Sequence, residues 1–105
     1  MLDPMRSPQH PATDDIQLTE VLRALSDPVR LEILGRLARE GHLYCFELGA
    51  EMDLHKSTLS HHYRILREAG VTHTSQEGRR KRLTLRRDDL DARFPGLLDS
   101  ILAAV

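Results

Sequence analysis

One side of the segment 56–69 carries hydroxyl, imidazole and cationic side chains, with no carboxylate before Glu68. The residues that share this side are Lys56, Ser57, Ser60, His61 and Arg64. Hydroxyl and imidazole groups can hydrogen bond to base edges or phosphates, while lysine and arginine neutralise phosphate charge. This combination packs poorly against protein and predicts a surface that enters a groove of DNA.

The other side of the same segment has the spacing of an amphipathic helix. Its apolar residues recur on one stripe: Leu59, Tyr63, Ile65, Leu66 and Ala69. Gly70 follows, and glycine readily takes the left-handed conformation in which many helices end. We therefore expect a recognition helix over residues 56–69 that the rest of the chain presents to DNA.

The neighbours Ser60, His61 and His62 superficially resemble a serine–histidine nucleophile. Adjacent residues on a helix point about 100° apart, so these side chains cannot form a proton relay. The sequence also has no phosphate-binding glycine loop, no nucleophile elbow and no metal-hydrolase spacing. We therefore expect neither an enzyme nor a bound cofactor.

The charge is unevenly distributed along a chain whose net charge is only −1. Residues 1–54 carry −5, residues 55–87 carry +7 and residues 88–105 carry −3. A basic block within a nearly neutral protein marks one face for a polyanion. A solvated basic surface is the plainer alternative, but this block spans both the expected recognition helix and the segment after it, which favours DNA.

After Gly70 the pattern alternates, as in a β-hairpin. Residues 71–76 and 82–86 predict its strands, with a turn at Glu77-Gly78. Cations gather at and just after the tip: Arg79, Arg80, Lys81 and Arg82. A hairpin that follows a recognition helix is a wing, and a cationic tip suits phosphates or a narrow minor groove.

Three helices are expected before residue 56. The first covers residues 14–25, and the second starts at a cap formed by Ser26 or Asp27, has Pro28 in its first turn and ends at Gly41. The third covers residues 44–52. We expect it to bury Leu48 and Met52 together with either Phe46 or Cys45. With a turn at 53–55, the third helix and the recognition helix form a helix-turn-helix.

The sequence divides into three parts. Residues 1–13 contain Pro4, Pro8 and Pro11 with little apolar content, which predicts a flexible N-terminal arm. Residues 14–94 form the winged helix-turn-helix domain, and residues 95–105 form a last helix opened by Pro95. Apolar residues at both ends predict a helical dimer interface: Leu18, Leu22, Leu97, Leu98, Ile101 and Leu102. Folding of the last helix onto its own core is the alternative.

The bulk composition fits one small domain. A chain of 105 residues has a limited core, and the expected fold class is mainly α with a small β-hairpin. We find no apolar run long enough to span a bilayer and no signal-peptide pattern. The single cysteine cannot form an internal disulfide, which fits a reducing cytoplasm.

Residues from about 18 to 87 resemble the ArsR/SmtB family of winged-helix repressors. The segments that carry the resemblance are ALSDPVRLEIL at 24–34, LSHHYRILREAGV at 59–71 and the wing sequence GRR at 78–80. The resemblance implies a homodimer with a helical interface, binding to an imperfect inverted repeat near its own promoter, and release of repression by an inducer.

Position by position, Ser60 and His62 match the Ser-x-His pair of the family's recognition helix. The resemblance is imperfect, because His55 stands where a serine cap is frequent, Ser57 where a proline is common and Tyr63 where leucine is usual. We expect His61 to face DNA, and His62 to be either a half-buried structural residue or a phosphate contact. The full predicted DNA-binding set is Lys56, Ser57, Thr58, Ser60, His61, His62, Arg64, Arg79, Arg80 and Lys81.

The inducer is the least determined part of the prediction. Metal-sensing relatives carry a Cys-x-Cys pair on the third helix, where this chain has Tyr44 and Phe46 around Cys45. The last helix offers Asp99 but no histidine for the family's other metal site, so we expect no metal ligands. The open alternatives are a metal held by scattered histidines, oxidation of Cys45, an organic ligand, or a winged-helix module that contacts an acidic protein instead of DNA.

Overall fold

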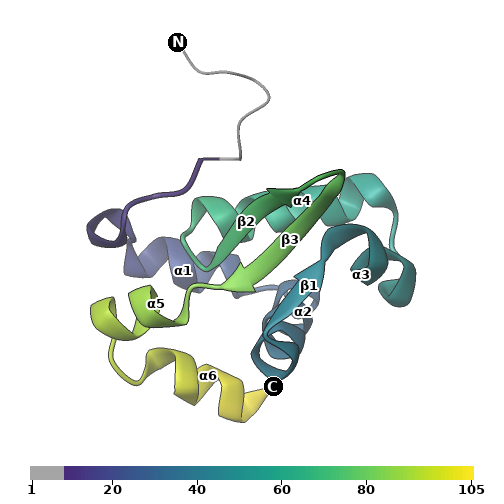
Figure 1. Cartoon of the computed structure of the whole chain (residues 1–105). Helices are drawn as coiled ribbons and strands as arrows, with labels where there is room; N and C mark the ends of the chain where they lie inside the picture. Colours follow the sequence, from purple (N-terminus) through teal and green to yellow (C-terminus); the bar gives the residue numbers. More distant parts are fainter. Residues whose placement is uncertain (1–8) are drawn as a thin grey trace.

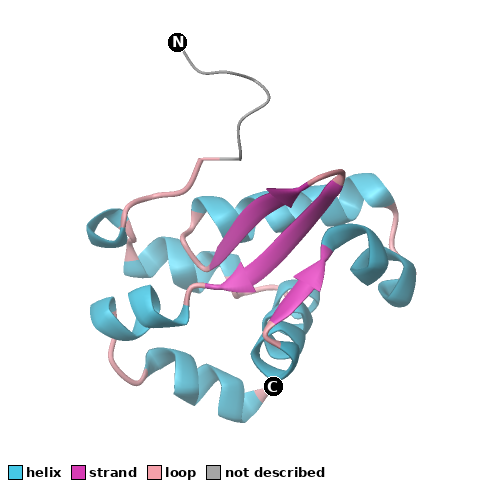
Figure 2. Cartoon of the chain, viewed as in Figure 1, coloured by secondary structure: helices cyan, strands magenta, loops and turns pink. Residues whose placement is uncertain are grey.

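A computed structural model describes residues 9–105, and residues 1–8 of the expected arm lie outside the described residues. The helices are η1 (Thr13–Asp15), α1 (Leu18–Ala24), α2 (Pro28–Glu40), α3 (Cys45–Met52), α4 (Lys56–Glu68), α5 (Arg87–Arg93) and α6 (Leu97–Ala104). The strands are β1 (His42–Tyr44), β2 (Thr72–Glu77) and β3 (Arg80–Leu85). Figure 2 shows one small sheet among helices, which confirms the predicted fold class.

Local signals set the bounds of α2. The Asp27 carboxylate accepts hydrogen bonds from the backbone N–H of Val29 at 2.9 Å and of Arg30 at 3.0 Å. Pro28 occupies the first turn, where a missing N–H costs nothing, and Gly41 ends the helix with φ 86°. The predicted cap, first turn and end of this helix are therefore confirmed.

The first helix starts later than predicted. Residues 13–15 form one 3₁₀ turn, and α1 begins only at Leu18, after Gln17 in an extended conformation. Ile16 between them is 1% exposed, so burial of this side chain interrupts the helical pattern. The same turn is tied to α5, because the Thr13 hydroxyl donates to Asp89 at 2.6 Å.

The segment just before that turn also contacts the domain. The backbone N–H of Thr74 donates to Nε2 of His10 at 2.9 Å, and Arg86 Nη1 donates to the Pro11 carbonyl at 2.8 Å. These hydrogen bonds place residues 10–13 against β2 and the end of β3.

The helix-turn-helix has the predicted order, with one correction in α3. The turn between α3 and α4 contains Asp53 in the left-handed conformation at φ 51°. Leu48 is 1% exposed, but Phe46 is 86% exposed, so the prediction that Phe46 could fill the core is wrong. Leu48 is the buried residue of α3, and of the two residues that were expected to join it, Cys45 is the half-buried one.

The sheet has three antiparallel strands in the order β1-β3-β2. The sequence did not predict β1, which pairs Leu43 with Leu83 of β3. The hairpin turn also lies one residue later than expected: Glu77 pairs with Arg80, so the loop residues are Gly78 and Arg79. Figure 1 shows the end of the hairpin on the same side of the molecule as α3, with α5 and α6 on the opposite side.

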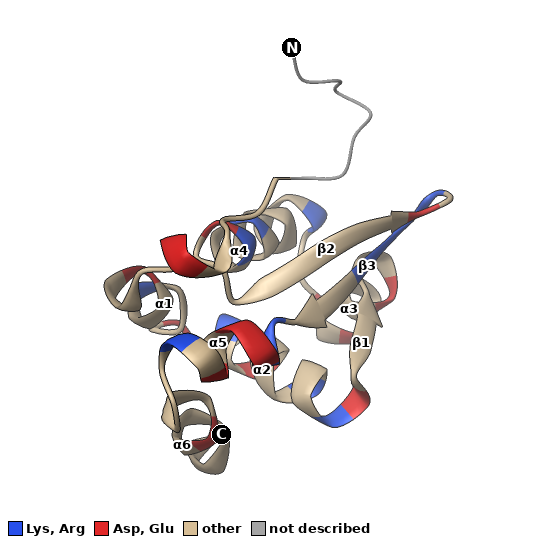
Figure 3. Ribbon diagram, turned by 60° about the vertical axis from the view of Figure 1, so that its left-hand side comes forward, with Lys and Arg blue, Asp and Glu red and all other residues tan. Residues whose placement is uncertain are grey.

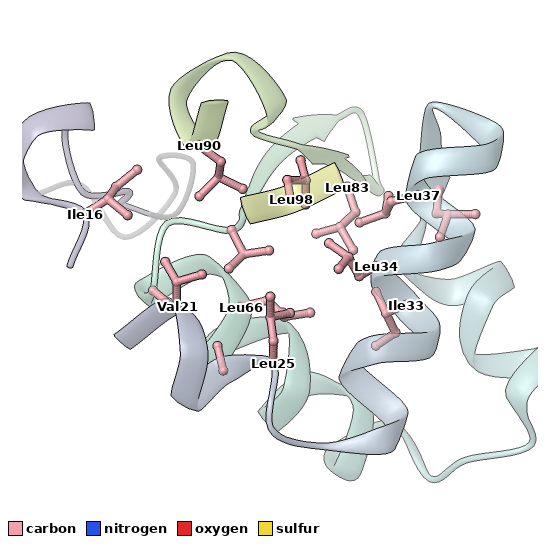
Figure 4. Packing of buried hydrophobic residues seen from close by; sticks show 14 of the residues in the cluster. Ile16, Val21, Leu25, Ile33, Leu34, Leu37, Leu66, Leu83, Leu90 and Leu98 are labelled. Carbon is pink, nitrogen blue, oxygen red and sulfur yellow. The ribbon is translucent and has the colours of Figure 1, made fainter. Parts of the chain in front are cut away.

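The core lies between the sheet and the helices. Figure 4 shows labelled side chains from α1, α2, α4, α5, α6 and β3 converging there. Leu34, Leu66, Val71 and Leu83 are completely buried. Leu66 fixes the apolar stripe of α4 against this core, which leaves the opposite side of α4 exposed. Gly70 follows α4 with φ 86°, and a Cβ there would lie 2.6 Å from Cγ1 of Ile16, so only glycine fits.

The terminal helices differ in their burial. Leu98 is 2% exposed within the single chain, so its place in the predicted dimer interface is corrected: it packs on its own core. Leu18 and Leu22 are 43% and 45% exposed, and Leu97, Ile101 and Leu102 are half-buried. Helix α6 begins at Leu97, because Gly96 before it has φ 84°. Among residues 9–105, no helix is long and apolar enough to cross a membrane.

Candidate nucleic-acid interface

The exposed side of α4 carries most of the predicted recognition residues. Six polar or cationic side chains are exposed along it: Lys56, Ser57, Thr58, Ser60, His61 and Arg64. The buried residues of the helix are Leu59, His62 and Leu66. The amphipathic pattern thus divides the helix into a side fixed to the core and a cationic, hydroxyl-bearing side open to solvent.

The start of α4 adds a second attraction for anions. His55 at the cap position makes no side-chain hydrogen bond to the helix backbone, and its Nδ1 lies 3.1 Å from Ser57 Oγ instead. The first N–H groups of the helix therefore have no side-chain partner at the cap, and the positive end of the helix dipole is available to a phosphate. A surface hollow at this end is lined by His55, Lys56, Ser57, Ser60, His61 and Arg64, with no carboxylate.

His61 and His62 have different surroundings. His61 is exposed, and its Nδ1 lies 3.1 Å from Arg64 Nη2, so both side chains share the open side of α4. His62 is 8% exposed, with Nδ1 3.1 Å from Arg30 Nη1 and 3.9 Å from Asp27 Oδ2. Burial lowers the pKa of His62, against the carboxylate of Asp27, which raises it. Of the two predicted readings, the surroundings of His62 are those of a structural histidine.

The wing carries its cations at the tip, where Figure 3 shows the blue of lysine and arginine along the start of β3. Arg80 is tied to α3 and β1: Nη2 lies 2.9 Å from Glu47 Oε1, and Cζ lies 3.4 Å from the centre of the Tyr44 ring. Arg79 and Lys81 are exposed. Both side chains of the Arg80–Glu47 pair are about half exposed, so a phosphate can exchange for the carboxylate at little cost.

Two of these relationships were missed by the sequence reasoning. Arg30 contacts His62 across 32 positions, and Glu47 contacts Arg80 across 33. Neither pair has a local spacing that would reveal it, since the partners meet only when α2 packs on α4 and the hairpin approaches α3.

The surroundings of Cys45 do not favour a reactive thiol. Burial raises the pKa of Cys45, which keeps the sulfur protonated and poorly nucleophilic. Its carbonyl accepts a hydrogen bond from the Tyr63 hydroxyl at 3.1 Å. Within residues 9–105, no three His, Cys, Asp or Glu side chains gather as a metal site would require.

Comparisons with known proteins agree with this architecture. A model described as a helix-turn-helix domain matches residues 25–74. The uncharacterized HTH-type transcriptional regulator YceK of Bacillus subtilis is 38% identical over 90 residues, which cover 85% of this chain and 90% of YceK. The HTH-type transcriptional regulator CmtR of Mycobacterium tuberculosis is 38% identical over 88 residues, covering 84% of this chain and 73% of CmtR.

Solved structures show the same fold. The ArsR family transcriptional regulator RHA00566 superposes with a TM-score of 0.67 at 28% identity, over 79% of this chain and 90% of that one. Its fold and the regulators' sequences match the helix-turn-helix and wing described above. The chain belongs to the ArsR/SmtB family of winged-helix transcriptional regulators and is itself a DNA-binding transcriptional regulator.

Proposed function

We propose that two copies of this chain form a homodimer that represses transcription by binding an inverted-repeat operator through α4 and the wing. The observation that carries the proposal is the division of α4 into a buried apolar side and an exposed side that bears six polar or cationic residues and no carboxylate before Glu68 at its last position. In a dimer, two such helices would lie about one DNA turn apart, roughly 34 Å. The protein would act by binding alone, without catalysis, and in the cytoplasm, where its DNA target lies.

Each part of the interface has a separate role in this proposal. Residues near the start and middle of α4 would approach base edges and nearby phosphates: Lys56, Ser57, Thr58, Ser60 and His61. Arg64 and the wing residues Arg79 and Lys81 would hold the DNA backbone or minor groove. Arg80 would join them when a phosphate replaces Glu47. We leave His62 out of the interface and assign it to the contact between α4 and α2.

Exposed apolar side chains support the dimer. Leu18 and Leu22 stand out from α1, and the half-buried Leu97, Ile101 and Leu102 come from α6. Burial of each such side chain is favourable by about 1.5–3 kcal/mol when it is complete, so a partner surface that covers both helices would stabilise a small domain. Leu98 is excluded from this surface because the chain's own core already covers it.

The experiment is fluorescence anisotropy with a labelled duplex from upstream of this protein's own gene. A random duplex of equal length is the control, and both are titrated across a salt series. We expect tight, salt-sensitive binding that prefers the upstream duplex. Weak binding that is equal on both duplexes would overturn the proposal and indicate a protein-contact module instead. Repeating the titration with divalent metals and with a thiol oxidant tests those two classes of inducer.

A further inference from the structure

A cavity of about 850 Å³ lies between α3, α4 and the hairpin. Its size falls within the range of small-molecule sites, about 300–1,000 Å³. One part of its wall is apolar or aromatic and includes Cys45, Phe46, Leu54, Leu59 and Tyr63. Phe46 is 86% exposed, so this aromatic ring has no protein partner that would explain its position. This apolar part of the wall could therefore contact the apolar part of a bound small molecule.

Two buried polar atoms at the cavity have no hydrogen-bond partner. Within the described residues, Nε of Arg67 and Oγ1 of Thr74 are buried and unpartnered, and both side chains line the cavity. Thr74 is only 3% exposed. Buried polar groups in proteins nearly always have a partner, so an unsatisfied donor beside a cavity points to a missing ligand or water. A guanidinium and a hydroxyl would both donate to an anionic oxygen.

The charged side chains around the cavity also favour an anion. Its lining includes five cations, Lys56, Arg67, Arg79, Arg80 and Lys81, and only two carboxylates, Glu47 and Asp53. Glu47 is already in an ion pair with Arg80, which leaves Asp53 as the one lining carboxylate without an ion pair among the described residues. A phosphodiester satisfies the cations but has no apolar body for Phe46 and Tyr63, whereas an organic anion satisfies both.

We propose that this cavity binds a small organic anion, a carboxylate or sulfonate attached to an aromatic or branched aliphatic body. The anionic group is held at the end lined by Arg67 and Thr74, and the apolar body lies against Phe46 and Tyr63. No covalent step is involved, and Cys45 contributes only to the wall.

The position of the cavity couples this ligand to DNA, a point that rests on the function proposed above. Lys56, Ser60, Arg79 and Lys81 belong both to the cavity lining and to the proposed DNA interface. A ligand that engages these side chains withdraws them from DNA, and by reciprocity DNA weakens the binding of the ligand. The organic anion is therefore an inducer that acts by direct competition at the DNA-facing surface.

The site itself is tested without DNA. The probes are 8-anilinonaphthalene-1-sulfonate, an aromatic anion, and N-phenyl-1-naphthylamine, its neutral analogue, each titrated by fluorescence. We expect one sulfonate probe per chain. Arg67→Met should weaken that probe about tenfold, the size expected for one charge-assisted hydrogen bond, and should leave the neutral probe unchanged. The matched control is Arg39→Met, at an exposed position on α2.

A second variant keeps the test decisive if Arg67→Met fails to fold. Ala50 is an exposed residue of α3 that lines the cavity, so Ala50→Trp should fill the cavity and abolish binding of both probes. Ala38→Trp, at an exposed position on α2, is its control. Binding of both probes that is equally strong in Ala50→Trp and Ala38→Trp would overturn the site, as would an Arg67→Met that behaves like Arg39→Met.

Competition is tested with a duplex that carries a far-red label, which the probe does not disturb. The sulfonate should raise the apparent Kd for DNA of the wild-type chain and of Ala38→Trp, but not that of Ala50→Trp. Unchanged DNA affinity at saturating probe would overturn the inducer role. A loss of DNA affinity in Arg67→Met with unchanged probe binding would instead show that the cavity binds a phosphate of the DNA backbone. If the chain bound no DNA at all, the fluorescence titrations would still decide whether the site exists.

Discussion

Nη1 of Arg30 lies 3.1 Å from Nδ1 of His62, which joins α2 to the buried side of the recognition helix. Arginine can only donate, so His62 must accept at Nδ1 and is neutral in this arrangement. Asp27 belongs to the same group, since its carboxylate caps α2 and lies 3.9 Å from His62. Protonation of this buried imidazole would remove the acceptor for Arg30, so this contact between α2 and α4 depends on the charge of His62.

Acidification should loosen this contact. Burial lowers the pKa of His62 from its ordinary value of 6.5, so the folded state binds its proton less readily than the unfolded chain. The stabilising contribution is complete above pH 6.5 and is lost as the pH falls from 6.5 through the lowered pKa. His62→Asn keeps an acceptor and removes the titration. Urea unfolding at pH 7.5 and pH 5.5 should show a smaller loss of stability for the variant, and equal losses would contradict this role.

His10 should show a separate acid transition. Burial is the main cause that lowers its pKa to about 4, followed by the neighbouring His73, whose ring stacks on it at 4.2 Å. Stability from this contact is present above pH 6.5 and is lost between pH 6.5 and pH 4, when Nε2 can no longer accept from the Thr74 N–H. NMR titration of the histidine ring protons should give a midpoint near pH 4. His73→Gln should move that midpoint upward, and an unmoved midpoint would remove His73 from the explanation.

Two charge substitutions, one in the wing and one in α3, should change the affinity for DNA in opposite directions. Arg79→Ala removes an exposed cation and should weaken binding to all duplexes. The negative slope of log K against log salt should become shallower by about 0.9 per lost phosphate contact. Glu47→Gln removes the carboxylate that holds Arg80. This variant should bind DNA more tightly, and its slope should become steeper by a similar amount. Anisotropy across a salt series measures both slopes. A wild-type slope for Glu47→Gln would show that Arg80 does not reach DNA.

A substitution on α4 should change specificity more than general affinity. Ser60 is exposed on the proposed DNA-facing side of α4. Ser60→Ala should reduce discrimination at one base pair by about 1–3 kcal/mol and leave affinity for random DNA unchanged. Competition binding with single-base variants of the upstream duplex measures this. An equal loss on random DNA would reassign Ser60 to a phosphate contact.

Two leucines separate dimerisation from folding. Leu22 is 45% exposed, so Leu22→Glu should leave the chain folded but shift sedimentation equilibrium toward monomers. Leu98 is 2% exposed in the single chain, and Leu98→Ala should lower the free energy of unfolding by about 2–5 kcal/mol. If Leu22→Glu sedimented like the wild type, the dimer surface would have to lie elsewhere.

The accuracy of the sequence predictions followed the range of the interactions involved. Helix α2 was predicted closely because its cap, its Pro28 and its terminal Gly41 are local signals that do not depend on distant residues. Strand β1 was missed because three residues carry no periodicity, and Leu43 becomes a strand residue only beside Leu83. The hairpin turn was misplaced by one residue, since Glu77 could serve equally as a turn residue or as the partner of Arg80.

The candidate site divides in the same way. The exposed side of α4 follows from its amphipathic pattern, which the 3.6-residue period makes readable from sequence alone. The position of Phe46 was not predictable, because α3 offers two adjacent residues of which only packing decides the burial. The cavity is likewise a product of tertiary packing, since α3, α4 and the hairpin follow one another along the chain but only their packing sets the space between them.

Strand β1 has a consequence for the kind of DNA this protein can distinguish. Its last residue, Tyr44, pairs with Arg82 of β3, and α3 begins at the very next position. The distance between the helix-turn-helix and the wing is therefore fixed by this strand pairing. A duplex with a different groove width must bend or compress to fit, and that deformation depends on base sequence. Base pairs that no side chain contacts would then contribute to operator choice through their stiffness.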